Sequence, residues 1–177
     1  MHTIKKYTMS EKNYFKKEAI DKLKELAESA RICMMTTKLD ERPSPSRPMT
    51  LQEVDENGVL WFLSGRDSDK NYELKKDTKT QLYFMNNSNS EYLSVYGTAE
   101  IYLDQNTIDE HWSVAANAWF KEGKEDPNVS VIGIKPLDVK YWGTKHGKFV
   151  DIALMAYSAI TGADKGGDGG EEGKLEV

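Results

Sequence analysis

Four polar side chains between residues 47 and 70 are of the types that bind a phosphate group. Arg47 lies in a segment of strand character, and Ser64 ends the next such segment. Ser68 and Lys70 stand at the start of a short predicted helix, where the first backbone N–H groups have no partner within the helix. Arginine, lysine, hydroxyl groups and a helix N-terminus are the groups that hold a phosphate dianion in proteins. The stretch therefore predicts a phosphate-binding cradle.

A purely structural interpretation of the same residues is also open. Ser68 could serve only as the N-cap of the helix, and Arg47 and Lys70 could be solvated surface charges. The spacing of the four residues does not decide between the two interpretations.

The elements that must position these residues alternate between strands and turns, with helices at intervals. Apolar residues recur every three or four positions over 15–30, which predicts an amphipathic helix. Further helices are predicted at 68–76, from a cap at Asn106 or Thr107 to about Phe120, and at 148–160. Strands are predicted at 32–37, 46–54, 59–64, 80–85 and 92–103, and then at 129–135 and 138–142 on either side of Pro136.

Two glycines indicate how the strands are joined. Asn57-Gly58 between two predicted strands is typical of a hairpin, because both residues tolerate the positive φ that tight turns need. Gly97 inside a continuous strand predicts a bulge or a sharp bend, which lets a sheet curl into a barrel.

Strands joined by short turns, with helices at the flanks, predict a mainly β fold built as an antiparallel barrel. A doubly wound parallel sheet is not favoured, because no glycine-rich fingerprint joins a strand to a helix. We expect an N-terminal arm at 1–12, one barrel domain at 13–161 and a disordered tail at 162–177, where the sequence is glycine-rich and acidic.

The composition excludes several classes of function. The net charge of −5 in 177 residues argues against nucleic-acid binding, and no apolar run reaches the length of about 20 residues that crosses a bilayer. Without a signal-peptide core, the sequence predicts a cytoplasmic protein. Cys33 is the one cysteine and is expected to be buried, and the three histidines lack the spacing of metal ligands.

Several motifs resemble the flavin-binding split-barrel superfamily of the pyridoxamine 5'-phosphate oxidases. The similar segments are Ser-Arg-Pro-Met-Thr-Leu-Gln at 46–52, Leu-Trp-Phe-Leu-Ser-Gly-Arg-Asp-Ser-Asp-Lys at 60–70 and Tyr-Gly-Thr-Ala-Glu at 96–100. The segments 118–127 and 140–143 resemble the general stress protein 26 branch. The resemblance covers about residues 15–160 and implies an antiparallel Greek-key split barrel that binds flavin mononucleotide (FMN) as a homodimer.

By this resemblance, Arg47, Ser68 and Lys70 would bind the FMN phosphate, with Ser64 close to it. The backbone from Met49 through Thr50 to Leu51 would run along the flavin ring, and Trp142 of a second subunit would close the site at the dimer interface.

The chain departs from the oxidase pattern at three places. Gln52 and Asp69 stand where an oxidase has basic residues, so weaker retention of FMN is expected. Val150 stands where the oxidase has a substrate-binding histidine, and Ile152 replaces an arginine. Oxidation of pyridoxamine phosphate itself is therefore not expected.

The resemblance implies an FMN-dependent oxidoreductase that acts on an unidentified small molecule, with no catalytic residue assigned. Two alternatives remain. The protein could bind FMN without turnover, or it could bind or degrade haem on the same fold, which would need an axial ligand such as His146.

Overall fold

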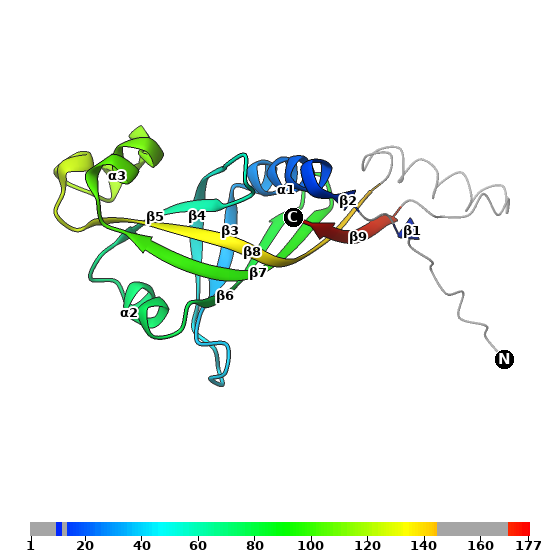
Figure 1. Ribbon diagram of the computed structural model, residues 1–177, viewed down its shortest axis with the longest axis horizontal. Coiled ribbons are helices and arrows are strands. Elements are labelled where there is room, and N and C mark those ends of the chain that lie inside the picture. The colour runs from blue at the N-terminus through cyan, green and yellow to red at the C-terminus, as the bar shows by residue number, and fades with distance from the viewer. Residues whose placement is uncertain (1–9, 12–13, 145–169) are drawn as a thin grey trace, which may run out of the picture.

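The computed structural model describes residues 10–11, 14–144 and 170–177 (Figure 1). Its strands are β1 (Ser10–Glu11), β2 (Tyr14–Phe15), β3 (Ile32–Thr36), β4 (Ser46–Val54), β5 (Leu60–Gly65), β6 (Lys79–Asn86), β7 (Glu91–Tyr102), β8 (Val129–Thr144) and β9 (Gly170–Glu176). Its helices are α1 (Lys16–Ala30), α2 (Asp69–Lys76), α3 (Gln105–His111) and the 3-10 helices η1 (Val114–Ala118) and η2 (Gly123–Glu125).

Six of these strands close into an antiparallel barrel. In the order β3, β4, β5, β8, β7 and β6, each strand pairs with the next, and β6 pairs back with β3. The jump from β5 to β8, with β7 and β6 leading back, is a Greek-key arrangement. Alternate residues face the interior, among them the buried Leu82, Phe84, Leu93 and Val95. The expected mainly β fold with flanking helices is confirmed.

The predicted hairpin at Asn57-Gly58 joins β4 to β5. Gly58 has φ of +80°, which a residue with a side chain rarely adopts. The Asp55 carboxylate accepts hydrogen bonds from the backbone N–H groups of Asn57 and Val59, at 2.8 and 2.9 Å. This turn fixes the register of the two strands that carry Arg47 and Ser64.

The predicted bulge at Gly97 is present, and it corrects the expectation that Pro136 separates two strands. Gly97 pairs with Pro136 and Tyr96 pairs with Asp138, so Leu137 is an extra residue in β8. A proline cannot donate to a ladder, but a bulge accommodates it. The segment 129–144 is therefore one continuous strand. A Cβ atom at residue 97 would overlap the backbone of Lys135, so glycine is needed there.

The helices α1 and α2 lie where the sequence predicted them, whereas α3 differs from the prediction. α1 packs Ala19, Leu23, Leu26 and Ala27 into the core, and α2 begins after Ser68 as expected. α3 is shorter than predicted. It is capped by the Asp104 carboxylate, which accepts from the N–H of Thr107 at 3.0 Å, and it ends at His111 because Trp112 is extended. The helix predicted at 148–160 lies outside the described residues.

α3 and the 3-10 helices cover a second, smaller core on the outside of the barrel. Its members are Ile108, Ala116, Phe120, Val129 and Val131. The His111 ring stacks on Trp61 with 4.0 Å between centroids, and its Nδ1 lies 2.7 Å from a carboxylate oxygen of Glu53. His111 is therefore buried by packing.

The C-terminal segment differs from the predicted disorder. Residues 170–176 form β9, which pairs antiparallel with β8 and parallel with the short strands β1 and β2. Leu175 is 1% exposed, so the one large apolar side chain of this glycine-rich segment reaches the core. Residues 162–169 lie outside the described part of the chain.

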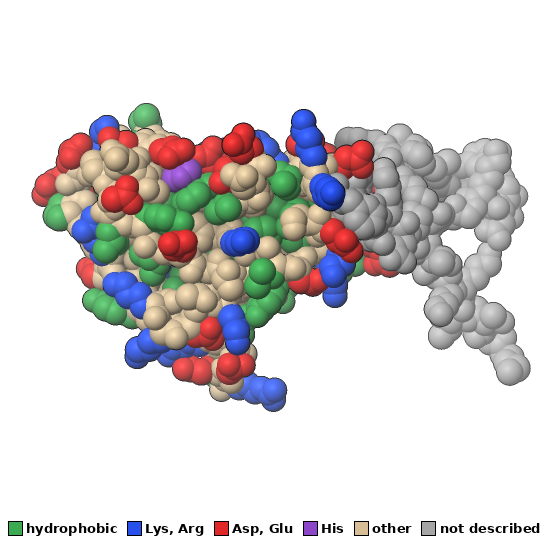
Figure 2. Space-filling view, in the orientation of Figure 1, with side chains coloured by type: hydrophobic (Ala, Val, Ile, Leu, Met, Phe, Trp, Pro, Cys, Tyr) green, Lys and Arg blue, Asp and Glu red, His purple; other side chains and the backbone are tan. Residues whose placement is uncertain are grey.

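Three expectations from composition can be compared with the described residues. Cys33 is buried as predicted, and burial raises the pKa of its thiol to about 12. The described helices include none that is long and apolar enough to span a membrane, and the described acidic, histidine and cysteine side chains form no cluster suited to a metal ion. On the side drawn in Figure 2, acidic side chains gather over the α3 end, and basic ones form no continuous stripe there.

Candidate functional site

The candidate site surrounds the start of α2, which follows β5 and lies on the opposite side of the barrel from α1 in Figure 1. The loop 66–68 leads directly from the end of β5 into the helix. The groups on β4, the groups at the end of β5 and the first turn of α2 are therefore held close to one another, as the sequence predicted.

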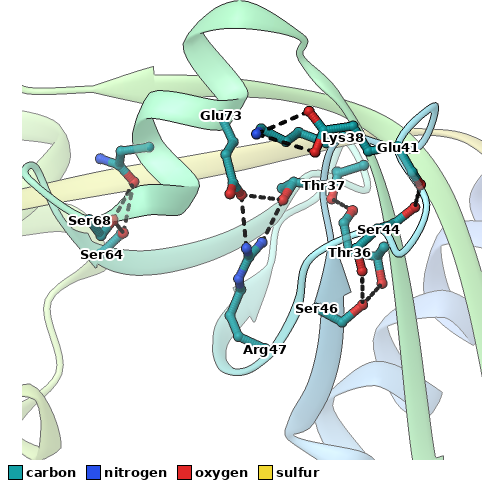
Figure 3. Close-up of polar contacts among 12 residues, drawn as sticks. Thr36, Thr37, Lys38, Glu41, Ser44, Ser46, Arg47, Ser64, Ser68 and Glu73 are labelled. Atoms are coloured by element: carbon teal, nitrogen blue, oxygen red, sulfur yellow. Dashed lines mark hydrogen bonds and ion pairs between the residues drawn. The ribbon is translucent and has the colours of Figure 1, made fainter.

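Arg47 points from β4 toward α2 and forms an ion pair there. Its Nη2 donates to Oε2 of Glu73 at 2.8 Å, and its Nη1 donates to Oγ1 of Thr37 at 2.6 Å. The Thr37 hydroxyl donates in turn to the same Glu73 oxygen, which closes a triangle of hydrogen bonds (Figure 3). The side chains of Arg47 and Glu73 are 23% and 12% exposed. Arg47 is therefore not a free surface cation.

Ser64 and Ser68 belong to a second polar cluster, centred on Asn71 of α2. Asn71 Oδ1 accepts from the hydroxyl of Ser64 at 2.8 Å and from that of Ser68 at 3.3 Å. Asn71 Nδ2 donates to Ser130 Oγ at 2.8 Å, and Ser130 donates to the carbonyl of Ser64 at 2.9 Å. Because Asn71 and Ser130 are fully buried, this cluster attaches α2 to the barrel.

Lys70 is partly buried in the first turn of α2, while Asp69 beside it is exposed. Burial lowers the pKa of Lys70, and the charge of Arg47 lowers it further, although Asp69, Asp67 and Glu73 act in the opposite direction. Among the described residues, no hydrogen bond or ion pair to the Lys70 ammonium is found. Lys70 is the cation of this site that remains available to an anion.

Gln52 has a side-chain oxygen without a partner. It is the extra residue of a bulge in β4, because Leu51 pairs with Phe62 and Glu53 pairs with Trp61. Its Nε2 donates to the carbonyl of Thr50 at 3.2 Å, but its Oε1 is buried and accepts no hydrogen bond. A buried acceptor without a donor is costly, and bulges often direct a side chain into a binding site.

The two other predicted residues of β4 lie on opposite faces of the strand. Met49 is 9% exposed and packs in the core, so its backbone alone could contact a ligand. Thr50 is exposed on the outer face and pairs with Ile32 of β3.

Trp142 lies far from the start of α2 within one chain. Ser130 of β8 is the partner of Ser64, and Trp142 follows Ser130 by 12 residues. A strand advances about 3.3 Å per residue, so the two positions are roughly 40 Å apart along β8. Trp142 pairs instead with Tyr92 and Glu172.

The sequence did not predict the residues that form hydrogen bonds with the expected phosphate-binding side chains, namely Glu73, Thr37 and Asn71. Glu73 follows Lys70 by three residues, a spacing that places both on one side of the helix, and this signal was available. Thr37 comes directly after β3, which pairs with β4 at Met35 and Arg47, but that pairing is visible only in the structure. Asn71 gave no signal, because a polar residue one turn into a helix is usually solvated.

Comparisons with known proteins agree with one another. The family described as pyridoxamine 5'-phosphate oxidase like matches residues 18–165. The chain is 32% identical to protein bli-3 of Neurospora crassa over 156 residues. These aligned residues cover 82% of this chain and 74% of the fungal protein.

Solved structures share the fold. A protein from Jannaschia sp. CCS1 assigned to general stress protein 26 superposes with a TM-score of 0.68 at 25% identity, over 90% of this chain and 96% of that one. A general stress FMN/FAD binding protein from Xanthomonas citri superposes with a TM-score of 0.62 over 72% of this chain and 89% of that one, and at 23% identity this likeness shows the fold alone.

The Arg47–Glu73 pair makes stability depend on pH. Burial raises the pKa of Glu73, but the hydrogen bond from Thr37 and the charge of Arg47 outweigh burial, so the pKa lies below the ordinary 4.5. The pair therefore stabilises the fold fully above pH 4.5, and its contribution is lost as the pH falls through the lowered pKa. As the pH falls from about 6 to about 3, we expect the wild type to lose more unfolding free energy than Glu73→Gln, because only the wild type has this carboxylate to protonate.

Urea unfolding followed by tryptophan fluorescence measures this difference. Glu41→Gln is the matched control, because Glu41 pairs with Lys38 at 3.1 Å but its side chain is 57% exposed. Equal losses in the wild type and Glu73→Gln would contradict the expectation.

Proposed function

The chain belongs to the pyridoxamine 5'-phosphate oxidase-like family, and from this membership we propose that it binds FMN with the phosphate at the start of α2. The observation that carries the proposal is the position of Lys70. This ammonium is half-buried and feels the charges of Arg47, Asp67, Asp69 and Glu73, but no carboxylate of the described residues lies within ion-pair distance of it. An exposed lysine needs no such explanation, but a half-buried one without a partner fits an anionic ligand.

The other groups of the phosphate site come from three elements. The first N–H groups of α2 lack partners within the helix and point toward its start, where Ser68 also lies. Ser64 lies behind Ser68, with 3.2 Å between their hydroxyl oxygens. Arg47 holds the side of the site next to Glu73. Asp69 adds a negative charge at its rim, which agrees with weak retention of FMN.

Gln52 fits the ring part of the same ligand. A flavin ring carries an N–H donor, and the unpartnered Oε1 of Gln52 is an acceptor that needs one. In this arrangement the ring runs along the outer face of β4 past the backbone of Met49 and the exposed Thr50. Bound FMN would supply two-electron redox chemistry, while the residues of the chain bind and orient it.

We extend the proposal to an FMN-dependent oxidoreductase that acts on a small molecule. The Thr37 hydroxyl donates to the Glu73 carboxylate, but that carboxylate is paired with Arg47 and is therefore a weak base. A reaction at this site would rely on the cofactor. Binding of FMN without turnover is the competing function. Haem binding is the third candidate, and its axial ligand His146 lies outside the described residues. Among the described residues, His111 is enclosed by Trp61 and Glu53 and is not available as a ligand.

An apolar face on the outside of the barrel supports a homodimer. Ile32 and Met85 are 56% and 55% exposed, and Tyr83 and Tyr92 are also exposed on the neighbouring strands. Met85 pairs with Tyr92, and Tyr92 pairs with Trp142, so the face runs from β3 to β8 without interruption. A second copy would cover this face, and its Trp142 could reach the ligand, which the chain's own Trp142 cannot do.

The binding proposal predicts that the phosphate contributes to affinity through Lys70. The wild type should bind FMN more tightly than riboflavin, which lacks the phosphate. Lys70→Met should weaken FMN binding roughly tenfold, because one charge-assisted hydrogen bond is lost, and should leave riboflavin binding unchanged. Titrations that follow flavin fluorescence measure both. Lys76→Met, at the exposed other end of α2, is the control, and equal affinities for FMN and riboflavin would exclude the proposed site.

Turnover separates the oxidoreductase from the protein that only binds FMN. Bound FMN in an oxidoreductase should be reduced by NAD(P)H and reoxidised by an added electron acceptor faster than free FMN at the same concentration. Absorbance near 450 nm, recorded after rapid mixing, follows the two steps, since reduced flavin loses this band. Rates equal to those of free FMN would favour binding without turnover.

The apolar face predicts the site of dimerisation. The wild type should sediment as a dimer, and Met85→Lys should shift it toward the monomer, because a buried lysine without a partner opposes association. Val114→Lys is the control, since Val114 is 81% exposed but belongs to the α3 end of the molecule. Sedimentation velocity at one protein concentration measures all three. A monomeric wild type would refute the dimer.

A further inference from the structure

Glu73 occupies the place where an anion would meet Arg47. The outer nitrogens of the guanidinium, Nη1 and Nη2, both donate within the triangle formed with Thr37 and Glu73 (Figure 3). The carboxylate at the centre of this triangle accepts from the arginine and from the hydroxyl of Thr37. A carboxylate and a phosphate use the same donors of an arginine, so one must give way to the other.

The charges around α2 favour the same conclusion. Arg47 and Lys70 are the cations closest to the start of α2, and Glu73 follows Lys70 by one helical turn. Asp67 and Asp69 add two negative charges, and the charge of Lys38, which also acts on Glu73, is paired with Glu41, so the neighbourhood holds three positive and four negative groups. A phosphate dianion that enters this neighbourhood is attracted by the cations and is repelled by Glu73, whose side chain is only 12% exposed and therefore poorly screened by water.

We propose that the Glu73 carboxylate is an internal competitor for the phosphate group at Arg47 and Lys70, and that it lowers the affinity of the protein for phosphorylated ligands. When the phosphate binds, the Arg47 donors exchange one anion for another, so the net gain is smaller than for an unpaired arginine. This inference rests on the proposed binding of FMN, and it assigns to Glu73 the control of affinity at that site.

A different role for Glu73 makes the opposite prediction. If Glu73 positioned the guanidinium for the ligand, its removal would release Arg47 and weaken binding. Glu73→Gln separates the two roles, because glutamine keeps an oxygen that accepts from Arg47 but carries no charge. Glu73→Ala removes both the oxygen and the charge.

The experiment compares the dissociation constants of FMN and riboflavin, measured by flavin fluorescence, for the wild type, Glu73→Gln and Glu73→Ala. If Glu73 is a competitor, both variants should bind FMN more tightly than the wild type, by roughly tenfold for one charge-assisted hydrogen bond. Their binding of riboflavin should be unchanged. Glu41→Gln removes one carboxylate from the nearby 37–45 loop and is the control for a general charge effect. Thermal unfolding shows which variants are folded, and either Glu73 variant is sufficient for the test.

Each outcome decides between the proposals. If the wild type binds FMN but the folded Glu73 variants bind it equally or more weakly, Glu73 is not a competitor and the binding proposal stands. A gain for riboflavin equal to the gain for FMN would also exclude competition with phosphate. If neither the wild type nor the variants bind FMN, both the proposed function and this inference are wrong.

Discussion

The double pairing of β8 is the constraint on which the rest of the structure depends. This strand pairs with β5 along one edge and with β7 along the other, and by doing so it closes the barrel. Without β8, β5 and β7 would be edge strands with unpaired backbone groups. The same strand carries Ser130, whose hydroxyl joins the cluster that attaches α2. Closure of the barrel and placement of the candidate site therefore depend on the same strand.

The short helix α2 is held by polar contacts more than by apolar packing. Leu74 is its one buried apolar side chain, and the buried Asn71 bridges Ser64, Ser68 and Ser130. Buried polar groups need specific partners at specific angles, so such a cluster fixes the rotation of the helix better than apolar contacts would. That rotation places Lys70 and Glu73 on the side that faces Arg47. The chemistry of the site thus follows from a hydrogen-bonded anchor on the other side of the helix.

Much of the fold was predictable from local signals. The hairpin at Gly58, the bulge at Gly97 and the apolar stripe of α1 depend on neighbours in sequence, and all three are present. The continuity of β8 through Pro136 was not predictable in this way, because it depends on the bulge that pairing with Gly97 creates. β9 was missed for a similar reason, since its glycines and acidic residues have low strand propensity and its order comes from pairing with β8.

The candidate site shows the same division. The sequence indicated which strands and which helix start bring Arg47, Ser64, Ser68 and Lys70 together, and the resemblance to flavin-binding split barrels supplied the ligand to expect. The sequence did not indicate that Arg47 has a partner, because the Arg47–Glu73 pair joins residues that are 26 positions apart and belong to two different elements. Predicted sites of charged residues commonly have this weakness, because counter-charges from other elements are invisible until the chain is folded.

The extra residue Leu137 changes which residue numbers of β8 face the interior of the barrel. Before the bulge, the even-numbered Ile132 and Ile134 point into the barrel, and after it the odd-numbered Val139 and Tyr141 do so. The bulge accommodates the inserted residue, so the residues beyond it stay opposite their partners on β7 and face the same side as those partners. Trp142 therefore lies on the outer side, opposite the exposed Tyr92. If Leu137 were built into a regular ladder instead of a bulge, every later residue would shift by one position and the tryptophan would turn inward.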